Sequence, residues 1–139
     1  MNIKKLLLGG IAGGIAFFLL GWLIFGMLLM DFMSNHPGTA GNLQREEPEF
    51  LYLALGNLLF GVLFAYIFIK GSVQSFGSGL ITGGIIGALM SAGFNCVMYG
   101  TSTITSKTAM AADVGGMTLM CALAGAVIGM VLGMGNKKP

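Results

Sequence analysis

Charged side chains are scarce in this sequence. Seven residues are basic and five acidic, 9% of 139 residues, while 55% are hydrophobic; a typical soluble domain carries about 25% charged residues. Such a chain cannot cover a water-facing surface, which excludes an ordinary soluble fold. The formal charge is only +2 and no basic stripe is present. The sequence therefore also lacks the electrostatic footprint of a nucleic-acid-binding protein.

Residues that carry catalysis or bind metals are equally few. The only histidine, His36, precedes a Pro-Gly pair, and the hydroxyl-rich segment "GTSTITSKT" contains no base that could activate a nucleophile. No spacing typical of a metal site or a cofactor fingerprint is present. The sequence predicts a protein that is not an enzyme and has neither a cofactor nor a metal site.

Long uncharged blocks are what the sequence does have. A helix needs roughly 20 apolar residues to cross the membrane, and in lipid the backbone must satisfy its own hydrogen bonds. We therefore predict an all-α integral membrane protein, a single domain over residues 1–139 that forms a four-transmembrane-helix bundle. The four blocks comprise residues 6–30, 50–69, 79–99 and 114–135.

The distribution of basic residues predicts the orientation. Positive residues near helix ends favour the cytoplasmic side, and five of the seven lie on one side if both termini are cytoplasmic. We expect a multi-pass protein of the cytoplasmic (inner) membrane with residues 31–49 and 100–113 outside. The cytoplasmic residues would be Lys4, Lys5, Lys70, Lys137 and Lys138, and the external ones Arg45 and Lys107.

The stretch "FGSGLITGGIIGALMSAGFN" contains glycines that resemble a dinucleotide-binding fingerprint. That fingerprint requires a preceding strand and a soluble βαβ unit, and neither is predicted. The glycines recur every four residues, which is typical of close packing between transmembrane helices. The predicted packing residues are Gly79, Gly83 and Gly87 in the third block and Gly125, Gly129 and Gly133 in the fourth.

A weak internal repeat accompanies these glycines. "IAGGI" from Ile11 matches "ITGGI" from Ile81, and both begin long apolar spans. Two tandem helical hairpins, related by an axis along the membrane normal, are one interpretation of this match.

Three segments carry a family resemblance: "GWLIFG" in the first block, "GFNCVMYG" at the end of the third, and Asp113 before "VGGMTLM". With these the chain resembles an uncharacterised family of small four-helix bacterial membrane proteins, a domain of unknown function. The resemblance implies the same membrane architecture and supplies no activity.

Polar residues within the spans suggest one candidate ligand site. Small residues gather in the cytoplasmic half and larger or polar ones in the outer half, which predicts a bundle that is tight inside and splayed outside. The hypothesis is an external crevice lined by Trp22, Asn57, Asn95 and Cys121. The alternatives are that the asparagines bond to each other or to a carbonyl group, and that Cys121 is a free thiol or pairs with Cys96.

Two function classes are consistent with these features. We favour a non-enzymatic accessory or assembly subunit whose partners are the lipid bilayer and either further copies of itself or a larger membrane complex. The alternative is a small transporter or channel with an external crevice for a small polar ligand or a soft metal ion, since methionines and cysteines gather in the outer half. The absence of an acid deep in a span argues against an ion pathway.

Overall fold

The computed structural model describes residues 1–39 and 47–135, so the predicted cytoplasmic Lys137 and Lys138 and the external Arg45 lie outside the described residues. Four helices are long and apolar enough to cross a membrane: Ile3–Leu28, Phe50–Lys70, Phe76–Thr101 and Lys107–Gly133. The described residues form no strand beyond one isolated bridge between Pro37 and Thr105. The chain is a multi-pass membrane protein with an all-α, four-helix bundle, as predicted.

The first span consists of two helical segments. Helix α1 (Ile3–Leu23) begins at Asn2, whose side-chain oxygen accepts hydrogen bonds from the backbone N–H groups of Lys4 and Lys5. It continues into one π-helical turn, η1 (Ile24–Leu28), where the N–H of Leu29 donates to the carbonyl of Ile24. A short helix, α2 (Met30–Asn35), follows.

The other three spans are single helices: α3 (Phe50–Lys70), α4 (Phe76–Thr101) and α5 (Lys107–Gly133). A reciprocal capping box between Ser75 and Ser78 begins α4, and the Ser106 hydroxyl caps α5 by accepting from the N–H of Ala109. The cap at Ser106 places the start of α5 seven residues before the predicted start at residue 114. The predicted start rested on hydropathy alone, which placed it directly after Asp113, the charged residue that precedes the fourth apolar block.

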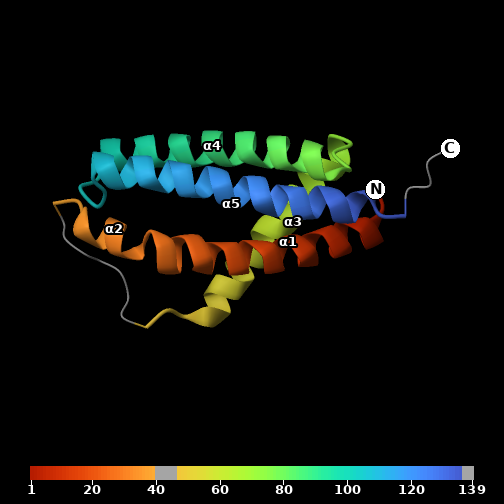
Figure 1. Cartoon of the computed structure of the whole chain (residues 1–139), viewed down its shortest axis with the longest axis horizontal. Coiled ribbons are helices and arrows are strands. Elements are labelled where there is room, and N and C mark those ends of the chain that lie inside the picture. The colour runs from red at the N-terminus through yellow and green to blue at the C-terminus, as the bar shows by residue number, and fades with distance from the viewer. Residues whose placement is uncertain (40–46, 136–139) are drawn as a thin grey trace.

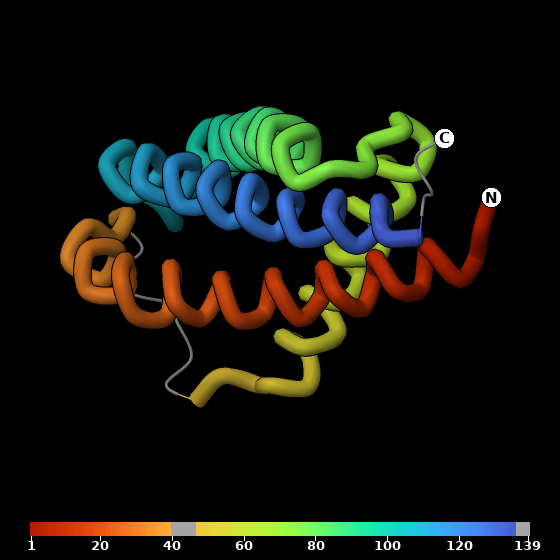
Figure 2. Tube along the Cα trace, turned by 45° about the vertical axis from the view of Figure 1, so that its right-hand side comes forward, coloured from red at the N-terminus to blue at the C-terminus, as the bar shows by residue number. Residues whose placement is uncertain are grey.

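The helices pack as a series of neighbours. Helix α4 packs along α5, α5 packs against α1, and α1 packs against α3. Figure 1 shows α1, α4 and α5 running along the long axis of the molecule, while α3 crosses α1 obliquely. We call the end at which α1 begins and α5 ends the termini end, and the end with residues 31–39 and 102–106 the distal end. Figure 2 shows the N-terminal part of α3 on the side of α1 away from α4 and α5.

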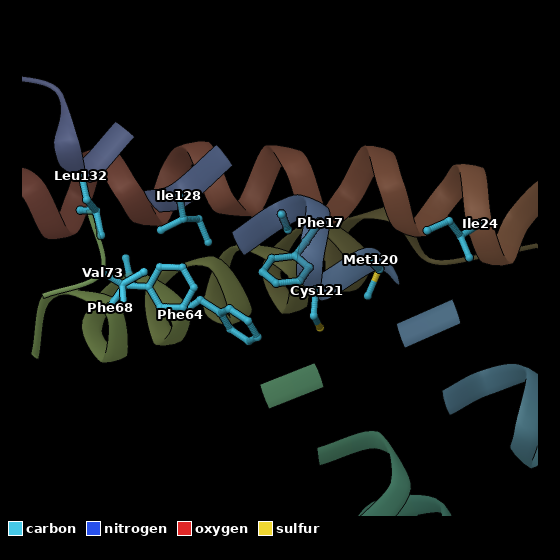
Figure 3. Close-up of a cluster of buried hydrophobic side chains, with 11 residues drawn as sticks. Phe17, Ile24, Phe64, Phe68, Val73, Met120, Cys121, Ile128 and Leu132 are labelled. Atoms are coloured by element: carbon cyan, nitrogen blue, oxygen red, sulfur yellow. The ribbon is translucent and has the colours of Figure 1, made fainter. Parts of the chain in front are cut away.

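The core lies at the termini end and in the middle of the bundle. Its aromatic centre is Phe17 of α1, which meets Phe64 of α3 edge to face with ring centroids 5.0 Å apart, and Phe68 lies one turn further along α3. Figure 3 shows these rings beside Ile128 and Leu132 of α5. All five side chains are at most 1% exposed. Side chains from α1, α3 and α5 therefore meet in one apolar core.

Glycines bring the helices into backbone contact around this core. A Cβ atom on Gly83 would collide with the carbonyl oxygen of Cys121, and one on Gly79 would collide with that of Gly125. A Cβ on Gly13 of α1 would lie 3.0 Å from the Cα of Gly61 of α3. Every packing glycine named from the sequence lies at the contact between α4, or the turn before it, and α5; the six are Gly79, Gly83, Gly87, Gly125, Gly129 and Gly133.

Candidate functional site

Three polar side chains meet between α4 and α5 toward the distal end. Ser91 and Asn95 lie one turn apart on α4 and are only 4% and 7% exposed. Both donate to the same carboxylate oxygen, Oδ2 of Asp113 on α5: the Ser91 hydroxyl at 2.9 Å and the Asn95 amide nitrogen at 2.6 Å. We call these three residues the polar cluster. It joins the two helices through charge-assisted hydrogen bonds.

The polar cluster continues the glycine ridge of α4. The buried residues of this helix recur every four positions: Gly79, Gly83, Gly87, Ser91 and Asn95. The Asn95 amide also donates to the carbonyl and hydroxyl oxygens of Ser91, at 2.9 and 3.2 Å. One face of α4 thus contacts α5 through glycine near the termini end and through hydrogen bonds near the distal end.

The position of Asp113 corrects one conclusion from the sequence. Asp113 was expected outside the fourth span, yet it is the seventh residue of α5, about 9 Å of helix rise beyond Lys107. A helix of 27 residues is about 40 Å long and exceeds a hydrocarbon core of about 30 Å by roughly 5 Å at each end. The helix that is long enough to cross the membrane therefore includes Asp113, near its distal end and not deep in the span.

No cationic side chain among residues 1–39 and 47–135 pairs with Asp113. Lys107, on the same helix, lies over the ring of Tyr99 with its Nζ 5.8 Å from the ring centroid. The carboxylate is half-buried and is stabilised by two neutral donors only. Ionisable groups within transmembrane segments are costly and usually mark functional positions.

Trp22 and Asn57 do not join Asn95. Trp22 is 63% exposed and lies beside Gly26 on its own helix. The Asn57 amide donates to the carbonyl of Leu53, 2.7 Å away on α3. The expected crevice therefore does not form from these residues, because α3 diverges from the bundle before it reaches Asn95. Both asparagines bond to a carbonyl group of their own helix, as the alternative expected, and Asn95 also bonds to Asp113 of α5.

Cys121 lies apart from the polar cluster in an apolar hollow. The thiol is free and buried, whereas Cys96 is free and exposed. Gly87 makes room for Cys121, since a Cβ there would lie 2.8 Å from its sulfur. Four sulfur-containing side chains line the hollow together with three phenylalanines. The lining residues are Phe17, Phe60, Phe64, Gly87, Met90, Met117, Met120 and Cys121.

This chain matches no family model, no curated protein and no solved structure. The resemblance to small four-helix bacterial membrane proteins thus stays a prediction.

His36 has a structural partner at the distal end. Its carbonyl oxygen accepts a hydrogen bond from the Ser106 hydroxyl at 2.6 Å, and its ring nitrogen Nδ1 lies 2.7 Å from the carbonyl of Phe32. No group of three or more His, Cys, Asp or Glu side chains gathers in the part of the chain that the structure describes. His36 thus connects the segment after α2 to the start of α5.

The sequence contained signals for the polar cluster that hydropathy did not use. Ser91 and Asn95 extend the four-residue spacing of the glycines, which predicts that both face a neighbouring helix. Ser106 followed by alanine-rich sequence is an N-cap signal that starts α5 before Asp113. Only the packing of α4 against α5 decides that the three side chains meet.

Proposed function

We propose that this chain is a non-enzymatic accessory or assembly subunit of the membrane that associates with a second copy of itself through the N-terminal half of α3. The observation that carries the proposal is the position of Asn57. Asn57 lies in the N-terminal half of α3, within a helix long and apolar enough to span the membrane, and among the described residues its amide bonds only to the Leu53 carbonyl of its own helix.

Leu58 and Phe60 of α3 meet Gly14 and Phe17 of α1, but the turns of α3 before Leu58 are largely exposed. No residue from Phe50 to Phe60 is buried, and Leu51 is 76% exposed. The buried residues of α3 begin at Gly61, although contact with α1 begins at Leu58. This half of the helix therefore presents its surface to lipid or to another transmembrane helix.

The side chain of Asn57 has hydrogen-bonding groups that lipid cannot satisfy. One N–H of its amide bonds to the Leu53 carbonyl, and the described residues provide no acceptor for the second N–H and no donor for the side-chain oxygen. Polar side chains in lipid bond across helix interfaces, with a gain of about 0.6 to 2 kcal/mol. An amide both donates and accepts, so two copies of Asn57 complement each other about a two-fold axis. The neighbouring Gly56 has no atom near its Cβ direction, which leaves room for a second helix.

The mass of the purified protein in nanodiscs or mild detergent tests this proposal. We expect a dimer for the parent, a shift toward monomer for Asn57→Leu, and retention of the dimer for Asn57→Gln, which keeps the amide. Thermal unfolding of each variant controls for damage to the fold. A parent that is monomeric at all concentrations, or an Asn57→Leu variant as dimeric as the parent, would contradict association through α3.

We further propose that the protein lies in the cytoplasmic (inner) membrane with both termini in the cytoplasm. The excess of Lys at the predicted cytoplasmic ends supports this orientation. A reporter fused after Pro139 should be active on the cytoplasmic side, and external accessibility of that terminus would reverse the assignment.

A small transporter or channel remains the second candidate, and one observation favours it. Asp113 stands inside a span, where acids frequently belong to ion or proton pathways. Ion flux into proteoliposomes measures this directly. Flux in the parent that is lost in Asp113→Asn would favour the transporter over the assembly subunit.

A further inference from the structure

We propose that the apolar hollow at Cys121 is a binding site for one soft monovalent metal ion, Cu(I) in size and charge, held by the Cys121 thiolate and by the methionine thioethers around it. The hollow is lined from α1, α3, α4 and α5. Cys121 is the fifteenth of the 27 residues of α5, so the site lies near the middle of that span. The inference goes beyond the proposed assembly function and does not rest on it, because the turns of α3 before Leu58 take no part in the site.

Three of the four sulfur-containing side chains come from one face of α5. Met117, Met120 and Cys121 have the spacing i, i+3 and i+4, and residues at this spacing are neighbours on the surface of a helix. The fourth, Met90, comes from α4, about one turn after Gly87, and all four line the same hollow. The packing of α4 against α5 therefore gathers one thiol and three thioethers around one space.

Glycines place two of these sulfur atoms. A Cβ on Gly87 of α4 would lie 2.8 Å from the sulfur of Cys121, and one on Gly21 of α1 would lie 3.5 Å from the sulfur of Met120. Figure 3 shows both side chains close to the ring of Phe17, which also lines the hollow. A larger side chain at position 87 would occupy the space beside the thiol.

The size of the hollow restricts the ligand. Its volume is about 10 Å³, near the lower limit for a single water molecule. The hollow therefore accepts one atom or ion and is too small for an organic molecule.

The atoms of the lining suit a soft ion. Among the described residues, the hollow is lined without polar surface, so it offers no oxygen ligand to a hard cation and no partner to a water molecule. Soft thiolate and thioether ligands select Cu(I). Cys121 is a free cysteine, so its sulfur is not engaged in a disulfide.

Charge balance favours a monovalent ion. When the metal–sulfur bond forms, the S–H bond of Cys121 breaks and its proton passes to water, because a metal ligand must be deprotonated. The thioethers remain neutral, so a monovalent ion and the thiolate cancel each other. A divalent ion such as Zn²⁺ would leave a net positive charge in an apolar environment, which is costly. Neither the metal nor the sulfur is oxidised or reduced in this step.

Binding of Ag⁺ to the purified full-length protein tests the proposal. Ag⁺ has the charge and the ligand preference of Cu(I) and is stable in air. The parent for these measurements carries Cys96→Ala, because the exposed Cys96 thiol would also react with Ag⁺. In buffer without chloride or thiols, we expect one Ag⁺ retained per chain after dialysis, one proton released per ion, and a saturable rise in Tm, since a ligand that binds the folded state stabilises it.

Variants locate the site. Cys121→Ala should retain no Ag⁺ after dialysis. Met90→Leu, Met117→Leu and Met120→Leu each keep the volume of the side chain and remove one thioether. Each should raise the Kd for Ag⁺ at least about tenfold, the lower limit for loss of even an outer partner of a metal ligand. Met130→Leu is the matched control, since Met130 lies on α5, is 49% exposed and does not line the hollow; it should bind like the parent.

Three results would overturn the proposal. One is a parent that retains no Ag⁺, and another is retention of Zn²⁺ as tight as that of Ag⁺. The third is a set of methionine variants that all bind like Met130→Leu, which would identify simple reaction of a buried thiol. If Cys121→Ala does not fold, the methionine variants decide alone. None of these results bears on the dimer test at Asn57, so the two proposals fail separately.

Discussion

The contact between α4 and α5 has two halves that are held in different ways. Toward the termini end, Gly79 and Gly83 bring the α4 backbone against Cys121 and Gly125 of α5. Toward the distal end, the polar cluster joins them through Asp113. Lipid provides no hydrophobic drive between helices, so close packing and hydrogen bonding are the means that remain. This helix pair uses both along one face of α4.

This difference indicates which amino-acid substitutions each half of the contact tolerates. The glycine half depends on shape, because its contacts are made by backbone atoms that cannot move aside. The polar half depends on hydrogen bonds between side chains. A side chain there can be replaced by another of similar size, so that the hydrogen bond is lost but no collision arises. Substitutions should therefore have larger effects in the glycine half than in the polar half.

The largest effect is expected for Gly83→Leu. A side chain here meets the Cys121 carbonyl oxygen and must push the two helices apart. Overpacking typically costs about 1 to 3 kcal/mol, and we expect the upper end because the obstacle is backbone. Thermal unfolding in detergent should show a markedly lower Tm, while membrane insertion survives because leucine fits lipid.

Gly93→Leu is the matched control for this change. It lies on the same helix, and a Cβ there meets no atom within 4 Å. Its Tm should equal that of the parent. If Gly83→Leu and Gly93→Leu unfold at the same Tm, the glycine half does not hold the helices together.

A smaller effect is expected for Asn95→Leu, which tests the polar half. The substitution preserves size but removes the donor 2.6 Å from Asp113 and leaves the carboxylate with Ser91 alone. Interhelical hydrogen bonds in membranes contribute about 0.6 to 2 kcal/mol, so we expect a loss of about 1 to 2 kcal/mol. If the variant is as stable as the parent, the amide does not hold the distal half together.

The smallest effect is expected for Ser91→Ala. Its hydroxyl donates to Asp113 at 2.9 Å, while Asn95 continues to donate to the same oxygen. We expect a loss of about 0.6 kcal/mol, measured by the same thermal unfolding. A loss as large as that of Gly83→Leu would show that the two halves do not differ in the way described here.

The π-helical turn η1 in the first span was not predicted. The Phe25 ring and Leu29 approach Gly116 of α5, where a Cβ would meet them at 2.9 to 3.2 Å. The wider turn at Ile24 changes which side chains of the first span face α5. Hydropathy contains no signal for such a turn, because the surrounding residues are apolar on every side.

The amino-acid sequence by itself determined the membrane class, the four spans and the spacing of the small residues. Long apolar blocks and four-residue glycine repeats are local patterns, and the physics of a helix in lipid acts on each of them separately. The divergence of α3, the separation of Trp22 and Asn57 from Asn95, and the meeting of Ser91, Asn95 and Asp113 were decided only by the tertiary structure. Asp113 lies 18 residues from Asn95 along the chain, and only the packing of α4 against α5 brings the two side chains within hydrogen-bond distance.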